Sequence, residues 1–220
     1  MWNFDEHGEL QRPKEEDWDA ISKVGDLSYS MAKVMSDKMA AKIAAEDGRF
    51  DAIAVNPCVV LGPCMTTAHE LVGSWQWVMA RMLTGRECAR GHQALWNICD
   101  VRDCGEIQAL IAESANARNG SRYNICATDD SGELNIFALQ SKLMRLFPDI
   151  KIGGAPEDGS LMRVHDGPRA HCDLARAELG LSTHHIDDTL KATGDTMIKL
   201  GLVVSTLAES PPPPDLLLVS

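Results

Sequence analysis

The chain has 220 residues, of which 45% are hydrophobic and 24% charged, so it can bury a sizeable core without disulfides or a metal ion. Its formal net charge of −11 makes nucleic acid and anionic membrane surfaces poor partners, and neither is expected. No apolar run approaches the ~18 to 20 residues of a membrane span, and the acidic start lacks a signal-peptide pattern, so the expected location is cytoplasmic.

Helices and strands are predicted in alternation from the N-terminus onward. Residues 1–26 are polar and charged, which predicts irregular surface structure. Residues 28–46 carry apolar side chains at helical spacing, which predicts a helix with an apolar stripe on one face. The stripe consists of Ala32, Met35, Met39 and Ile43. A β-branched run at 53–55 then passes through Asn-Pro into a second apolar run closed by Gly-Pro, the pattern of a strand entering a loop.

The same alternation continues to the end of the chain. Further helix signals lie at 72–83, 105–114, 134–147, 173–179 and 187–200. Strand signals lie at 95–101 and 121–127, with a brief extended piece at 151–154. Strands that alternate with long helices indicate an α/β protein with parallel pairing, followed here by a mainly helical last third. The tail contains four consecutive prolines and predicts an extended, mobile end.

Cysteine, aspartate and histidine residues suggest ordinary structural roles. The seven cysteines form no C-x-x-C pair and have no histidines at zinc-site spacing, so we expect reduced, mostly buried thiols and no metal site. Asp100 and Asp103 suit the cap and first turn of a helix, and need no catalytic role. His184 and His185 are interpreted as loop residues.

Tyr29 and Lys33 are the candidate catalytic residues. A spacing of four residues on a helix places a phenol and an ammonium group on one face, within reach of each other. A phenol with a pKa near ~10 is a poor acid at neutral pH, but a neighbouring cation lowers that pKa. The pair can therefore supply a proton donor, although the spacing alone also fits an exposed surface pair.

Four motifs in order make the candidate site more specific. The Y-x-x-x-K helix at 29–33 precedes NPCVVLGP at 56–63, DVRD at 100–103 and GSRYNICA at 120–127. This order resembles the extended short-chain dehydrogenase/reductases of the NAD-dependent epimerase/dehydratase superfamily, and among them the dihydroflavonol reductase and cinnamoyl-CoA reductase-like group. The resemblance runs from about residue 1 to residue 202 and excludes the proline-rich tail.

The resemblance implies a fold and a division of the chain. It implies the C-terminal part of a Rossmann-type doubly wound parallel sheet, with a smaller and mainly helical substrate lobe. Residues 1–130 would be a remnant of the NAD(P)-binding domain, interleaved with segments of the substrate lobe. Residues 131–202 would be mainly substrate lobe, and 203–220 a disordered tail.

The resemblance also implies an activity and a cofactor site. Tyr29 would protonate the carbonyl oxygen of a small substrate during reduction, while Lys33 would tune the phenol and hydrogen-bond the ribose of NADP or NAD. Residues that would line the nicotinamide ring are Pro57, Cys58, Val59 and Val60. The implied function is an NAD(P)H-dependent oxidoreductase of a ketone, aldehyde or CoA thioester.

The sequence departs from this family at its N-terminal side. It has no G-x-x-G-x-x-G turn for a pyrophosphate, and only 28 residues precede Tyr29, fewer than one βαβ unit requires. The family's catalytic serine or threonine is expected upstream of the first residue, so Ser22, Ser28 and Ser30 are not assigned that role. The expectation is a truncated chain with negligible cofactor affinity, inactive alone.

Two other functions stay open. One is an inactive fragment that acts, if at all, through protein contacts, including self-association through an uncovered sheet edge. The other is a lyase or isomerase of the sugar epimerase or dehydratase type, because the tyrosine and lysine pair serves those enzymes as well. No diagnostic constellation in the sequence identifies the substrate.

Overall fold

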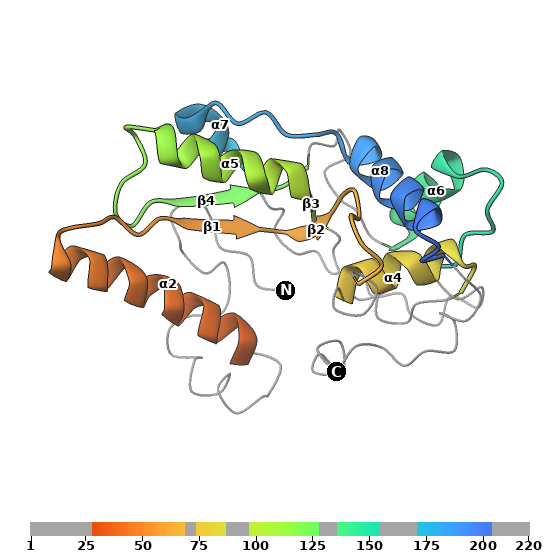
Figure 1. The fold of residues 1–220 in the computed structure, drawn as a ribbon, viewed down its shortest axis with the longest axis horizontal. Coiled ribbons are helices and arrows are strands. Elements are labelled where there is room, and N and C mark those ends of the chain that lie inside the picture. The colour runs from red at the N-terminus through yellow and green to blue at the C-terminus, as the bar shows by residue number, and fades with distance from the viewer. Residues whose placement is uncertain (1–27, 69–73, 87–96, 128–135, 155–170, 204–220) are drawn as a thin grey trace.

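The computed structural model describes residues 28–68, 74–86, 97–127, 136–154 and 171–203. These residues form helices and strands in alternation (Figure 1). The elements are α2 (Ser28–Asp47), β1 (Ala54–Pro57), β2 (Val59–Leu61), α4 (Ser74–Leu83), β3 (Ile98–Asp100), α5 (Val101–Glu113), β4 (Arg122–Ile125), α6 (Ile136–Leu146), α7 (Asp173–Leu179) and α8 (Ile186–Lys199). The predicted α/β class is confirmed.

The strands pair in parallel, as predicted. β1 pairs with β4 and β2 pairs with β3. Cys58 separates β1 from β2, and its N–H donates to the carbonyl oxygen of Ile125 at 3.2 Å. The next N–H, that of Val59, donates to the carbonyl oxygen of Asn97 at 2.8 Å. The chain therefore changes its partner from β4 to β3 at a single residue, while keeping its direction.

Helices cover both sides of the β1–β4 pair. α5 and α7 lie on one side and α2 on the other (Figure 1). β3 runs directly into α5, which returns the chain to β4, the crossover that a parallel arrangement requires. α4, α6 and α8 gather at the far end of the strands around β2 and β3. The predicted helical last third is confirmed by α6, α7 and α8.

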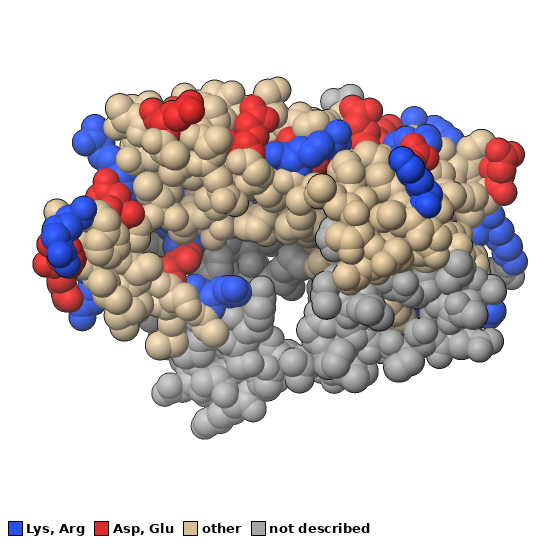
Figure 2. All heavy atoms as spheres, in the orientation of Figure 1, with Lys and Arg blue, Asp and Glu red and all other residues tan. Residues whose placement is uncertain are grey.

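Two apolar clusters hold these layers together. One packs α4, α6 and α8 against β2 and β3, and its fully buried side chains include Leu61, Met79, Met82, Leu143 and Leu190. The other lies between the β1–β4 pair, α5 and α7, and includes Ile107, Tyr123, Ile125 and Ala175. Acidic and basic side chains are interspersed on the face drawn in Figure 2. No helix among the described residues is both long enough and apolar enough to span a membrane.

A buried carboxylate joins β3, α5 and α8. Asp100, the last residue of β3, is the N-cap of α5 and accepts a hydrogen bond from the N–H of Arg102. It also accepts bonds from the Arg102 guanidinium at 2.8 and 2.7 Å, and from Thr189 Oγ1 at 2.8 Å. Asp103, in the first turn, bonds the backbone N–H and ring of His184. The predicted capping role is confirmed for Asp100, and Asp103 lies in the first turn of α5 as predicted.

The apolar stripe predicted on the first helix is not the face that packs on the described sheet. α2 spans the expected residues, but Met35, Met39 and Ile43 are 58%, 53% and 48% exposed. Its buried residues are Val34 and Ala44, at 7% and 2% exposure. The spacing of apolar residues identifies an apolar face, but small side chains decide how closely a helix backbone can approach a sheet.

Several predicted boundaries shift by a few residues. α5 begins at Val101 and not at 105, because the Asp100 cap starts the helix immediately after the strand. The brief extended piece predicted at 151–154 belongs to no strand, and its Gly153 N–H donates to the carbonyl oxygen of Met82 at 2.8 Å. The predictions for residues 1–26 and for the proline-rich tail lie outside the described residues.

Candidate active site

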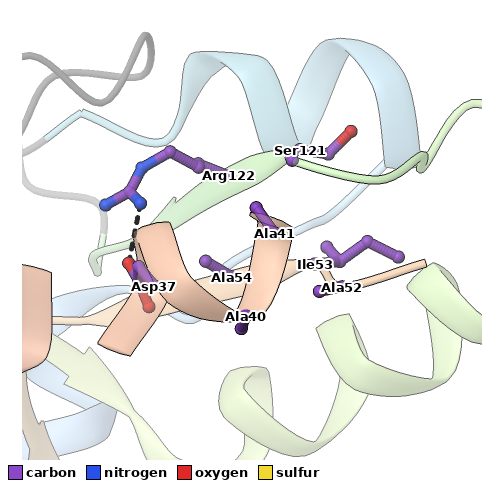
Figure 3. Close-up of a pocket in the computed structure, with 9 residues that line it drawn as sticks. Asp37, Ala40, Ala41, Ala52, Ile53, Ala54, Ser121 and Arg122 are labelled. Carbon is purple, nitrogen blue, oxygen red and sulfur yellow. Dashed lines mark ion pairs between the residues drawn. The ribbon is translucent and has the colours of Figure 1, made fainter. Parts of the chain in front are cut away.

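Helix α2 is fixed to the sheet by polar contacts. Asp37 forms an ion pair with Arg122 of β4 at 2.7 Å, and the two side chains point toward each other across a small cavity (Figure 3). Asn119 Nδ2 donates to the carbonyl oxygen of Ala41 at 3.0 Å, and Asn119 Oδ1 accepts from the N–H of Ala52 at 3.0 Å. The cavity measures about 60 Å³, which suits one or two water molecules and not a cofactor.

These contacts define the direction of α2 relative to the strands. Ala41 lies beside Asn119, whereas Asp37, one turn earlier in the helix, pairs with Arg122, three residues later in the chain. Moving toward the start of α2 therefore means moving toward the carboxyl ends of β1 and β4. The first two turns of α2, which contain Tyr29 and Lys33, accordingly lie toward those carboxyl ends. In open α/β sheets, ligands bind at that end of the strands.

The same face of α2 carries both candidate residues. Positions 29, 33, 37 and 41 are four residues apart, so each is rotated by only about 40° from the one before. Asp37 contacts the β4 side of the sheet, so position 33 lies beside that face, about 40° away, and position 29 is rotated by about 80° from Asp37. The Lys33 side chain is exposed. The side chain of Tyr29 lies outside the described residues.

The other candidate residues surround the change of partner between β1 and β2. Pro57 is exposed, and Cys58 and Val60 are partly buried. Val59 is only 1% exposed and packs in the core. Burial raises the pKa of the Cys58 thiol to about 12, and the neighbouring Cys172 and Cys104 add to the effect, so Cys58 is a neutral lining group.

An unsatisfied amide lies directly before this segment. Asn56 Nδ2 is buried and has no hydrogen-bond partner among the described residues. A buried donor without a partner costs about 1–3 kcal/mol, so it is best explained by an acceptor that the described residues do not supply. The position of Asn56, beside Pro57 at the carboxyl end of β1, makes it an additional candidate for ligand binding. No feature of the sequence indicated this.

The described residues fit only one end of a dinucleotide. A pyrophosphate requires free backbone N–H groups at a glycine-rich turn before a helix. Where β3 enters α5, the Asp100 carboxylate already accepts the N–H of Arg102, and its negative charge would repel a phosphate. The orphaned Asn56 amide and the exposed Lys33 suit the nicotinamide and ribose end. The group is therefore accommodated in part, and the sequence contains no phosphate-binding turn.

The comparisons with known proteins agree with this geometry. A model of the NAD dependent epimerase/dehydratase family matches residues 5–126. The chain belongs to that family, and its fold is of the Rossmann type. The family name and neighbours solved with NAD+ or NADPH indicate that the family binds a nicotinamide cofactor.

Similar proteins extend beyond the part that this chain matches. A protein of Schizosaccharomyces pombe described as an uncharacterized oxidoreductase is 26% identical over 178 residues, which are 79% of this chain and 50% of that protein. Vestitone reductase from alfalfa superposes with a TM-score of 0.64 at 14% identity, covering 90% of this chain and 59% of that one. The Bordetella bronchiseptica enzyme WbmF, solved with NAD+ and UDP, gives a TM-score of 0.59 at 20% identity, covering 82% and 56%. The chain thus spans about half the length of these proteins.

Proposed function

We propose that the chain forms the catalytic-tyrosine side of an NAD(P)-dependent oxidoreductase that acts on a carbonyl or alcohol group of a small molecule. The observation that carries this proposal is the direction of α2, which brings its N-terminal turn toward the carboxyl ends of parallel strands in a chain of the epimerase/dehydratase family. The resemblance to dihydroflavonol and cinnamoyl-CoA reductases favours a ketone, aldehyde or CoA thioester as substrate.

In this proposal each candidate residue has a separate task. Tyr29 donates a proton to the substrate oxygen during reduction, and the Lys33 ammonium favours the phenolate that remains. Lys33 also hydrogen-bonds the ribose, and Pro57, Cys58 and Val60 lie against the nicotinamide ring, with the buried Val59 supporting them from the core. NADP or NAD, when bound, supplies the hydride. The Asn56 amide is available to an acceptor on the same ligand.

The decisive experiment uses the longest polypeptide that the gene encodes. Tyr29→Phe should abolish reduction of an aldehyde panel while cofactor affinity is kept, because only the proton donor is lost. Lys33→Met should weaken both, whereas Lys38→Met, at another exposed position of α2, should change neither. Retention of wild-type turnover by Tyr29→Phe would contradict the proposal.

A second measurement concerns the 220 residues alone. Without a phosphate-binding turn, a few ribose contacts are unable to offset the ~4–15 kcal/mol that association costs. We expect no binding of NADPH or NADH at micromolar concentrations by fluorescence titration. Micromolar binding with steady turnover by this polypeptide would contradict that expectation.

The family also makes an isomerase or lyase a second candidate, since its members include sugar epimerases. The two candidates differ in their cofactor balance. A reductase consumes one NAD(P)H per product, whereas an epimerase converts a UDP-sugar with no net change in cofactor. If the full polypeptide does neither and binds no nicotinamide cofactor, the alternative of an inactive protein acting through contacts is favoured.

A further inference from the structure

Five cysteines lie close together beneath α5 and α7. They are Cys58, Cys99, Cys104, Cys126 and Cys172. Cys58 lies at the junction of β1 and β2, close enough to Cys104 and Cys172 for electrostatic interaction between the thiol groups. None of the five is in a disulfide bond. The described residues contain no group of side chains with the geometry of a metal site, so the cluster requires another explanation.

The Cys99 and Cys104 thiols lie close enough to form a disulfide bond after a small movement. Their Sγ atoms are 3.8 Å apart and share an S–H···S hydrogen bond. A disulfide requires about 2.05 Å, so the two atoms must approach by less than the width of a methyl group. Cys99 is the central residue of β3 and Cys104 lies in the first turns of α5, so closure needs a small adjustment of one helix end.

The two thiols differ in access and in charge. Cys99 is completely buried, whereas Cys104 is partly exposed. The hydrogen bond from Cys99 lowers the pKa of Cys104, and the N-terminus of α5 favours a thiolate there as well. Burial and the nearby carboxylates of Asp103 and Asp100 oppose this effect without reversing it. Cys104 is therefore the better nucleophile of the pair, and Cys99 is the neighbouring buried thiol.

We propose that Cys104 is a peroxide-reactive thiol and that Cys99 is its resolving partner, so that mild oxidation closes a Cys99–Cys104 disulfide. The Cys104 thiolate attacks one oxygen of hydrogen peroxide, the O–O bond breaks, and a sulfenic acid and hydroxide form. The Cys99 sulfur then attacks the Cys104 sulfur, the S–O bond breaks, and a second hydroxide leaves. Two thiols lose two electrons and two protons, and one peroxide becomes two waters.

Closure of this bond would act on the hydrogen-bonded junction of β3, α5 and α8. The two cysteines flank Asp100, whose carboxylate links Arg102 and Thr189. A disulfide across it fixes the first turns of α5 to β3, and a thiol reductant releases them. The cross-link is independent of the proposed oxidoreductase activity, because it rests on neither Tyr29 nor Lys33.

The experiment uses the chain as it stands and needs no variant. Trypsin cleaves after Arg102, between the two cysteines, so a disulfide keeps the peptides 91–102 and 103–118 together. After treatment with hydrogen peroxide and blocking of free thiols, mass spectrometry should find these peptides joined and lighter by two hydrogens than their sum. Dithiothreitol should separate them.

Two variants test the order of events. Cys99→Ser should leave Cys104 as a sulfenic acid that dimedone labels, and Cys104→Ser should leave Cys99 unmodified at the same peroxide dose. Cys172→Ser serves as the control and should still form the 91–102 to 103–118 link. The proposal is overturned if both thiols stay free in peroxide, or if a Cys126–Cys172 link or a Cys58 adduct forms first.

Discussion

Replacing Asp100 by asparagine removes the charge of a fully buried carboxylate and keeps its shape. The asparagine oxygen can still accept from the N–H and Nε of Arg102. Its amide nitrogen, however, would face two donors, the second guanidinium nitrogen and the Thr189 hydroxyl, which lie 2.7 and 2.8 Å from Asp100 Oδ2. Thr189 can turn toward the carbonyl oxygen of His185, at 3.3 Å, so part of the loss is recovered.

The size of the effect follows from these bonds. A hydrogen bond to a charged group contributes roughly 1.5–3 kcal/mol, and the Arg102 share is reduced because its side chain is 41% exposed. We expect Asp100→Asn to lower the free energy of unfolding of the chain by about 3 kcal/mol, measured by urea denaturation with far-UV circular dichroism. Asp195→Asn, at an exposed ion pair with Lys191, should cost less than about 0.5 kcal/mol. Equal effects of the two substitutions would refute the reasoning.

Three further predictions concern stability at acid pH, two glycine substitutions and self-association through the exposed face of α2. Burial raises the pKa of Asp100, but the bonds from Arg102 and Thr189 outweigh burial and hold the pKa below its usual 3.8. The stabilisation by this carboxylate is therefore present near neutral pH and is lost as the pH falls below about 3.8. Asp100→Asn should flatten that part of a curve of unfolding free energy against pH. A Cβ at Gly194 would lie 2.3 Å from Phe147 Cζ, so Gly194→Ala should destabilise the fold by about 1–3 kcal/mol. A Cβ at Gly105 would meet open space, so Gly105→Ala should stabilise the fold by about 0.5–1 kcal/mol. Equal shifts of the melting temperature in the two variants would be inconsistent with this packing. The exposed stripe of α2, and the edge of β1 that pairs with no strand among the described residues, support self-association. The chain should therefore elute above monomer size, and Met39→Lys should shift it toward monomer. A concentration-independent monomer would argue against this.

The elements themselves were predictable, because their signals are local. The strand at β1, the helix α7 and the alternation of strands with helices follow from β-branched runs, helical spacing and Gly or Pro stops. The cap of α5 was also predictable, since an aspartate before an amphipathic run is a common N-cap. The change of partner at Cys58 was not, because it depends on hydrogen bonds to residues 97 and 125, far away in the sequence.

The thiol cluster and the orphaned amide were also beyond the reach of sequence reasoning. Cys99 and Cys104 are only five residues apart, yet the sequence does not reveal that a strand end and a helix start bring their sulfur atoms within 3.8 Å. Asn56 stands out only when its hydrogen-bond partners are sought in three dimensions. Both features depend on how residues from separate helices and strands lie relative to one another, which the sequence does not show.

Helix α2 shows most clearly which structural features can be predicted from the spacing of residues in the sequence. The four-residue repeat that places Tyr29 and Lys33 on one face also includes Asp37 and Ala41, which contact β4 and the turn before it. The apolar repeat at 32, 35, 39 and 43 lies on a different face, which the described sheet leaves exposed. The sequence therefore shows which residues share a face, while the ion pair of Asp37 and the burial of Val34 and Ala44 show which face is turned to the sheet. That ion pair helps to hold α2 in the direction that brings its first turns toward the carboxyl ends of the strands, so the proposed site depends on Arg122 as well as on the motif itself.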